Sequence, residues 1–260
     1  MLCATAISSS FAAQPPLKRS FSVVKNLFSN FSINGNTLEI KNDKFYEFPE
    51  DSKLQFSKII VHPTCSKVNL KNVSFKGELV LPKNTWLGQM SIELPTTGNS
   101  VMLQKVTHPD SLGVNELIKL ILSNNTSNEC KEDLLKSLKK TFEYKRYMLN
   151  GGNNVAEIIE GLGYEPTDDC LQKLFQCFLD GIKDFNRNSR FPLRQILNQL
   201  TDTVIPDDIK PQFIEEVKMS LRNFVLSDKD LSDVRSFIEK QGYHWDDVTR
   251  GIEIKQKSLR

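Results

Sequence analysis

Cysteine and histidine are the residue types with which this sequence could carry out nucleophilic chemistry. The chain has five cysteines and three histidines among 260 residues. A cysteine nucleophile needs a base within reach and a third group that orients the base. His62 stands three positions before Cys65, whereas Cys130 could meet a histidine only through folding. No known cysteine-enzyme signature surrounds them, and the candidate catalytic residues are Cys65, Cys130, His62 and His244.

Two further cysteines, Cys170 and Cys177, are seven positions apart and share one face of a predicted helix. A metal site would need additional Cys or His ligands, and none is near in the sequence. We therefore interpret both as buried core thiols and predict neither a metal nor another cofactor. An odd number of cysteines without tight pairs favours free thiols in a reducing compartment.

The densest cluster of functional residue types follows Gly242 and comprises Tyr243, His244, Trp245 and Asp246. Aromatic side chains beside acidic ones can form a binding edge for a protein partner. The same residues can also pack back onto the helices that precede them, and the sequence favours this second interpretation.

The first 38 residues contain no Asp or Glu, although the chain carries 32 acidic residues. A secretory signal peptide would place positive charge before an unbroken apolar run, whereas Ser8–Ser10 interrupt the run here. An organelle transit peptide is also acid-poor and Ser-rich. The favoured interpretation is an unfolded export leader. An amphipathic stretch from Phe21 to Phe28 could contact a membrane surface or a secretion chaperone, or be a transient turn.

From residue 38 to residue 106 the apolar residues alternate with a period of two, which predicts half-buried strands. Clear examples are Leu54 with Phe56 and Leu79 with Leu81. The expected strands lie in LEIKND, KFYEFP, KLQFSKIIV, KVNLKNVSF, GELVL, WLGQMSIEL and SVMLQKV.

The same region also contains an apolar row with a spacing of five, formed by Ile60, Cys65, Leu70, Phe75 and Val80. A pentapeptide solenoid requires a second, small apolar residue two positions earlier, because both point into a narrow stacked core. Val68 and Val73 satisfy this requirement, whereas Lys58 and Glu78 do not. The pattern favours a small antiparallel sheet, with a short solenoid as the alternative.

The stretch SKVNLKNVSFKGELVL resembles the degenerate pentapeptide segments of some enterobacterial type III secretion effectors. It covers about twenty residues, and the acid-free leader agrees with it. The resemblance implies secretion into a host cell and carries over no functional residue.

Beyond His108 the apolar residues recur at helical spacing. Ser227 with Asp230 has the form of a capping box at a helix start. We expect helices that begin at residue 110 or 111 and others over residues 129–149, 154–162, 168–185, 191–204, 207–221 and 227–242.

The predicted fold is therefore α+β: a disordered leader over residues 1–37, a small antiparallel β-rich domain over 38–107 and an all-helical domain over 108–260. A net charge of +2 gives no reason to expect a nucleic-acid partner, and no apolar run is long enough to span a bilayer.

The sequence favours a virulence effector that is secreted into the host cytoplasm and binds a host protein. The alternatives are a cysteine-nucleophile enzyme, such as a protease or a ubiquitin-pathway transferase, and an organelle-imported protein.

Overall fold

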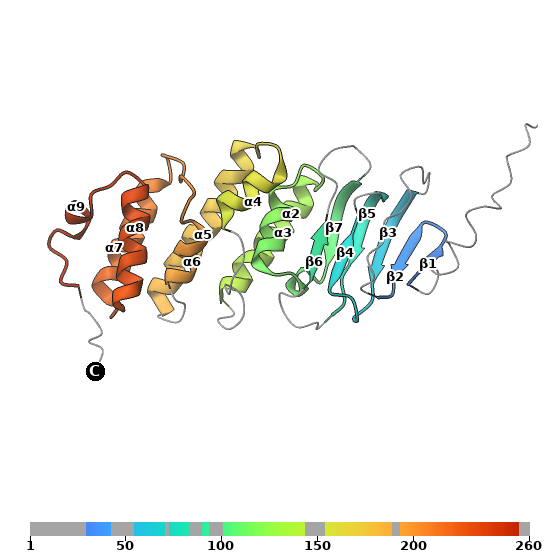
Figure 1. Cartoon of the computed structure of the whole chain (residues 1–260), viewed down its shortest axis with the longest axis horizontal. Coiled ribbons are helices and arrows are strands. Elements are labelled where there is room, and N and C mark those ends of the chain that lie inside the picture. Colours follow the sequence, from blue (N-terminus) through green and yellow to red (C-terminus); the bar gives the residue numbers. More distant parts are fainter. Residues whose placement is uncertain are drawn as a thin grey trace, which may run out of the picture.

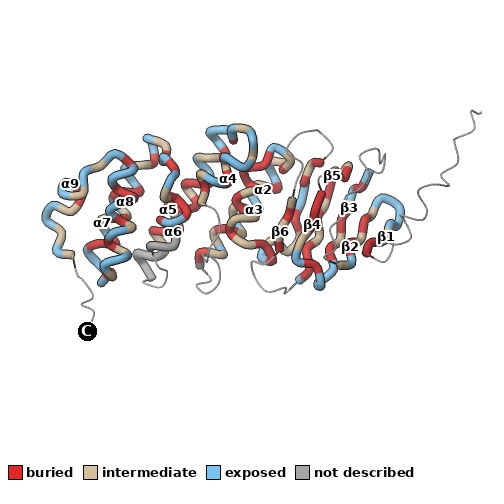
Figure 2. The backbone as a smooth tube through the Cα atoms, viewed as in Figure 1, coloured by how far each residue is buried: buried red, intermediate tan, exposed pale blue. Residues whose placement is uncertain are grey.

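The computed structural model describes residues 30–42, 55–70, 73–83, 90–93, 101–143, 154–188 and 193–254. The strands occupy one end of an elongated molecule and the helices occupy the other (Figure 1). Buried residues run through the interior of both parts and form one continuous apolar core (Figure 2). This mixture of strands and helices confirms the α+β class.

The strands of the described segments form two sheets. The larger sheet has the order β1-β2-β3-β5-β7, and the smaller one pairs β4 with β6. Their bounds are β1 (Phe31–Asn34), β2 (Thr37–Ile40), β3 (Gln55–Val61), β4 (Lys67–Asn69), β5 (Ser74–Val80), β6 (Ser91–Glu93) and β7 (Val101–Thr107).

Neighbouring strands run parallel throughout β2, β3, β5 and β7. Since β4 and β6 fall between them in the chain and form their own parallel pair, the chain alternates between two sheets and winds forward as a coil. The prediction of an antiparallel sheet is therefore wrong for all pairs except the β1–β2 hairpin. Hydrophobic alternation marks which face of a strand is buried, but it is the same for parallel and antiparallel neighbours.

Strand alternation, rather than a spacing of five, decides which apolar residues enter the core. Ile59 pairs with Leu79 and both are fully buried, whereas Ile60 and Val80 are only half-buried. Cys65, Leu70 and Phe75 of the five-residue row are buried as the solenoid alternative expects. Successive side chains of a strand point to opposite faces, so Val80 cannot share the inward face of Phe75 in an unbroken β5.

Gly77 permits a close approach between β3 and β5. The register between these strands shifts beside Gly77, and it shifts again between β5 and β7 after the same residue. A Cβ atom placed on Gly77 would lie 1.9 Å from the backbone oxygen of Ser57. Only glycine fits at this irregularity without displacing the backbone.

The coil continues past β7 with a helix in place of a strand. Leu112 forms a parallel bridge with Met90, which directly precedes β6, and Thr126 forms one with Leu103 of β7. Between them lies α2 (Val114–Leu122), whose Glu116 carboxylate accepts a hydrogen bond of 3.0 Å from the backbone amide of Ile92. The region beyond residue 108 is therefore not purely helical, because the backbone at Leu112 and Thr126 still pairs with the strand region.

The remaining helices continue the elongated stack in two rows. One row contains α3, α5 and α7, each packed on the next; in the other, α2 packs on α4 and α6 packs on α8. Their bounds are α3 (Asn128–Glu143), α4 (Val155–Leu162), α5 (Asp168–Asn188), α6 (Leu193–Gln199), α7 (Lys210–Asn223), α8 (Asp228–Lys240) and α9 (Trp245–Thr249), and a short 3-10 turn, Pro109–Ser111, precedes α2.

The capping box that the sequence predicted is present at the start of α8. The Ser227 side chain accepts a hydrogen bond from the Asp230 amide, and the Asp230 carboxylate accepts one from the Ser227 amide. Aspartate thus replaces the more usual glutamate in this motif.

Two features of the structure lie at the predicted domain boundaries. β1 (Phe31–Asn34) lies inside the segment that was predicted to be an unstructured leader, 1–37. Backbone hydrogen bonds from Leu103 to Asn125 and from Ser127 to Leu103 cross the predicted domain boundary at 107/108. Residues 1–29, which include the amphipathic stretch from Phe21 to Phe28, and the expected strand KFYEFP lie outside the described residues.

Candidate functional site

His62 and Cys65 lie in one turn, but their side chains contact different groups. The Cys65 thiol is 3% exposed and donates to the backbone oxygen of Ile40, with the sulfur 3.6 Å from it. The His62 imidazole is exposed, and its Nδ1 lies 3.0 Å from the Thr64 hydroxyl. A thiol buried against a carbonyl is poorly placed to attack a substrate.

The thiols of the helical part are buried as well. Burial, followed by the nearby charge of Asp133, raises the pKa of Cys130 to about 11. Burial, followed by the charge of Asp180, raises the pKa of Cys177 to about 12. The Cys170 thiol donates to the Ile121 carbonyl at 3.0 Å. These environments favour the neutral thiol, which agrees with the interpretation of Cys170 and Cys177 as core residues.

The predicted binding residues lie at the far end of the helical stack, where α8 ends and α9 begins. The amide of Gly242 donates to the Glu239 carbonyl and the amide of Tyr243 donates to the Ile238 carbonyl, which closes α8. Gly242 adopts a left-handed conformation with φ of 84°, as the residue after a helix often does. This turn directs the chain into α9, which packs against α7 and α8.

We call residues 243–246 the C-terminal edge. Tyr243 and Trp245 are half-buried and pack against the core, whereas His244 and Asp246 are exposed. The two rings therefore fill a structural role, while the imidazole and the carboxylate face solvent. Half-buried rings with polar neighbours supply the apolar and polar contacts that protein interfaces use.

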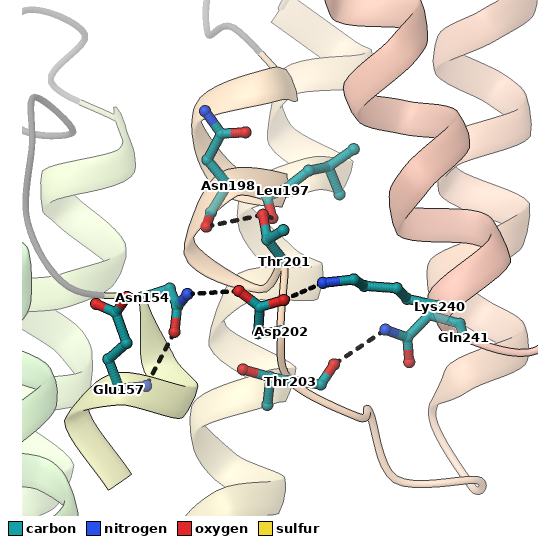
Figure 3. A network of polar contacts seen from close by, with 9 residues as sticks. All are labelled: Asn154, Glu157, Leu197, Asn198, Thr201, Asp202, Thr203, Lys240 and Gln241. Atoms are coloured by element: carbon teal, nitrogen blue, oxygen red, sulfur yellow. Dashed lines mark hydrogen bonds and ion pairs between the residues drawn. The ribbon is translucent and has the colours of Figure 1, made fainter. Parts of the chain in front are cut away.

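A polar network directly before the C-terminal edge was not predicted (Figure 3). Gln241 is 5% exposed; its side-chain oxygen accepts a 3.0 Å hydrogen bond from the Ile205 amide, and its side-chain nitrogen donates to the Thr203 carbonyl at 3.0 Å. These two bonds fix the end of α8 to the loop that follows α6. Because Gln241 lies two residues before Tyr243, they also position the C-terminal edge.

Asp202 lies at the centre of the same network. Its carboxylate accepts a hydrogen bond from the Lys240 ammonium and another, of 3.0 Å, from the side-chain amide of Asn154. The hydrogen bond from Lys240 is the main reason that the pKa of Asp202 lies below its usual range. The sequence contains a signal for only one member, since Asn154 precedes an apolar-periodic segment as a helix-capping residue does. No local pattern relates Asp202 to residues so distant in the chain.

The outer face of the larger sheet carries a second set of charges. Glu78 lies between Lys58 and Lys105, with N–O distances of 3.1 Å and 3.5 Å. A hydrogen bond from Thr107, followed by one from Lys58, lowers the pKa of Glu78. Each charge is matched by a neighbour on an adjacent strand, so the row stabilises the coil across its strands.

Comparison with protein-family models, with curated proteins and with solved structures finds no match to this chain. No group of three or more His, Cys, Asp or Glu side chains within the described residues is arranged to hold a metal ion. Within the same residues, none of the helices combines the length and apolar character that a membrane span requires.

Proposed function

We propose that this protein is a secreted virulence effector that enters the host cytoplasm and binds a host protein through its C-terminal edge. The observation that carries the binding proposal is the position of this edge, where half-buried rings and exposed polar groups meet at the end of an elongated stack. Stacked architectures use extended surfaces to bind other proteins. The acid-free first 38 residues and the resemblance of residues 66–81 to type III effectors support the secretion part.

The secretion part is tested with reporter fusions in a bacterium that has an active type III machine and in a matched strain without it. Because β1 begins at Phe31, residues 1–29 should suffice for export, and residues 30–260 alone should remain inside the cell. Export of the shortened chain at the level of the full chain would remove this part of the proposal. The mass of the mature protein separates it from organelle import, because a transit peptide is cleaved.

The binding part is tested with His244→Ala and Asp246→Ala, since both side chains are exposed and their loss should not disturb the core. Lys229→Ala is the matched control, because Lys229 is exposed near the opposite end of α8. We expect cross-linking in host cells to give a discrete adduct that both edge variants weaken and Lys229→Ala preserves. An adduct that survives both edge substitutions would place the binding surface elsewhere.

A further inference from the structure

Two side-chain oxygens near the end of α6 are buried and, within the part of the chain that the structure describes, have no hydrogen-bond partner. They are Oε1 of Gln199, the last residue of α6, and Oγ1 of Thr203. The two residues are 5% and 8% exposed. A buried polar atom without a partner destabilises a fold, and native proteins satisfy almost all such atoms with protein groups or with bound water.

The backbone between these two residues is compact. The Leu200 amide donates to the Leu197 carbonyl at 2.9 Å, and the Thr203 amide donates to the Leu200 carbonyl at 3.1 Å. Each bond closes a tight turn, so the chain covers little distance between Gln199 and Thr203. The two oxygens are nevertheless not bonded to each other, since neither has a partner. A gap that is too long for a direct hydrogen bond is where a bridging water fits.

The end of α8 borders the same place. Gln241 donates through Nε2 to the Thr203 carbonyl at 3.0 Å, and its Oε1 accepts the Ile205 amide at 3.0 Å (Figure 3). Gln241 thus bonds to the backbone of Thr203 but not to its hydroxyl. Because α6 also packs on α8, the unpartnered oxygens belong to the contact between these two helices.

We propose that one internal water molecule binds between Gln199 and Thr203. The water donates to Oε1 of Gln199, which can only accept. It also bonds to the Thr203 hydroxyl, which can both donate and accept. Internal waters are held by two to four polar partners, and these two atoms meet that requirement. Since Thr203 also holds Gln241, the water helps to fix the turn that positions the C-terminal edge, whatever that edge binds.

Thr203→Val in the full chain tests this site, because valine has the shape of threonine without the hydroxyl. If the hydroxyl holds a water, its loss breaks a buried hydrogen bond, and the melting temperature should fall by about 2–4 °C. If the hydroxyl holds nothing, the substitution removes an unsatisfied polar atom, and the melting temperature should stay unchanged or rise. Either of these two results would overturn the proposal.

Thr201→Val is the matched control, since it makes the same chemical change in the same turn. The Thr201 hydroxyl is bonded to the carbonyls of Leu197 and Asn198 at 3.2 Å and 3.1 Å, and Thr201 is only half-buried. Solvent can replace these bonds, so this variant should shift the melting temperature less than Thr203→Val does. An equal shift would mean that valine itself is unfavourable in this turn, which would also count against the water.

A second substitution tests whether the two oxygens share one water. Gln199→Met removes the amide oxygen while it retains a side chain of similar length. Because Gln199→Met and Thr203→Val break the same bridge, the shift of the double variant should be clearly smaller than the sum of the single shifts. Additive shifts would show that the two oxygens are independent and would overturn the shared site.

Oxygen-17 magnetic relaxation dispersion of the solvent detects long-lived internal water in solution and separates the water from other causes of instability. The dispersion of the wild type should exceed that of Thr203→Val by the contribution of about one water molecule, as one bridging site requires. Thr201→Val should match the wild type. Equal dispersions of the wild type and Thr203→Val would overturn the proposal even if the melting temperature falls.

Discussion

Gly77 of β5 lies close to the backbone oxygen of Ser57 in the neighbouring strand β3. We expect Gly77→Ala to lower the free energy of unfolding by about 2 kcal/mol or more, because the added Cβ would force one strand away from the other. Chemical denaturation monitored by circular dichroism measures this change.

Gly161→Ala is the matched control for this substitution, because a Cβ there meets nothing within 4 Å and the residue lies inside α4. It should stabilise the protein by about 0.5–1 kcal/mol, since alanine is the better helix former. Equal effects of the two substitutions would contradict the account of the β3–β5 approach.

The buried thiols give a second prediction for single residues. At about pH 8 we expect iodoacetamide to leave Cys130 and Cys177 unmodified in the native protein and to alkylate both in guanidinium chloride, because only the thiolate reacts. Peptide mass spectrometry resolves each site. Rapid alkylation of native Cys130 would instead support the alternative of a cysteine nucleophile.

The same thiols make stability depend on alkaline pH. The folded-state pKa of Cys177, about 12, lies above the ordinary cysteine value of 9.0 because the thiol is buried. The unfolded chain therefore loses this proton first as the pH rises, and the free energy of unfolding falls above about pH 9. Cys177→Ala should reduce the difference in stability between about pH 8 and about pH 10. An identical pH dependence in the variant would show that this thiol does not contribute.

Among the secondary-structure elements, α2 has a specific role at the end of the smaller sheet. Glu116 accepts the Ile92 amide and is also paired with Lys119 at 2.8 Å. We expect Glu116→Ala to cost about 1–3 kcal/mol, because the Ile92 amide would lose its partner at a mostly buried position. Glu116→Gln, which retains an acceptor, should recover a large part of this loss in thermal unfolding. If Glu116→Gln lowers the stability as much as Glu116→Ala does, the charge of Glu116 matters rather than its hydrogen bond.

The sequence predicted the types of these elements better than their arrangement. Alternation at Leu79 and Leu81 and helical spacing around Leu174 are local signals, and the structure places β5 and α5 there. The parallel direction of the strands depends on which distant segments meet, and local spacing does not contain that information. The same reason explains the candidate site: Tyr243 and Trp245 were found by composition, whereas Asp202 has partners 48 and 38 positions away.

At the scale of the whole molecule, the stack brings each part into contact mainly with its neighbours along the axis. A local loss of stability should therefore remain local, as in repeat proteins. We expect Gly77→Ala to accelerate native-state hydrogen exchange in β3, β5 and β7 far more than in α7 and α8. Uniform acceleration from one end to the other would instead show that the chain unfolds as a single cooperative unit.

The last turn of the coil also has a practical consequence for anyone who expresses part of this chain. A cut at residue 107, where strands give way to helices, would remove Leu112, Glu116 and the backbone around Thr126. Two rows of amide and carbonyl groups would then face water, and such rows recruit other chains into aggregates. A soluble fragment of the β-rich end should therefore extend at least through Ser127.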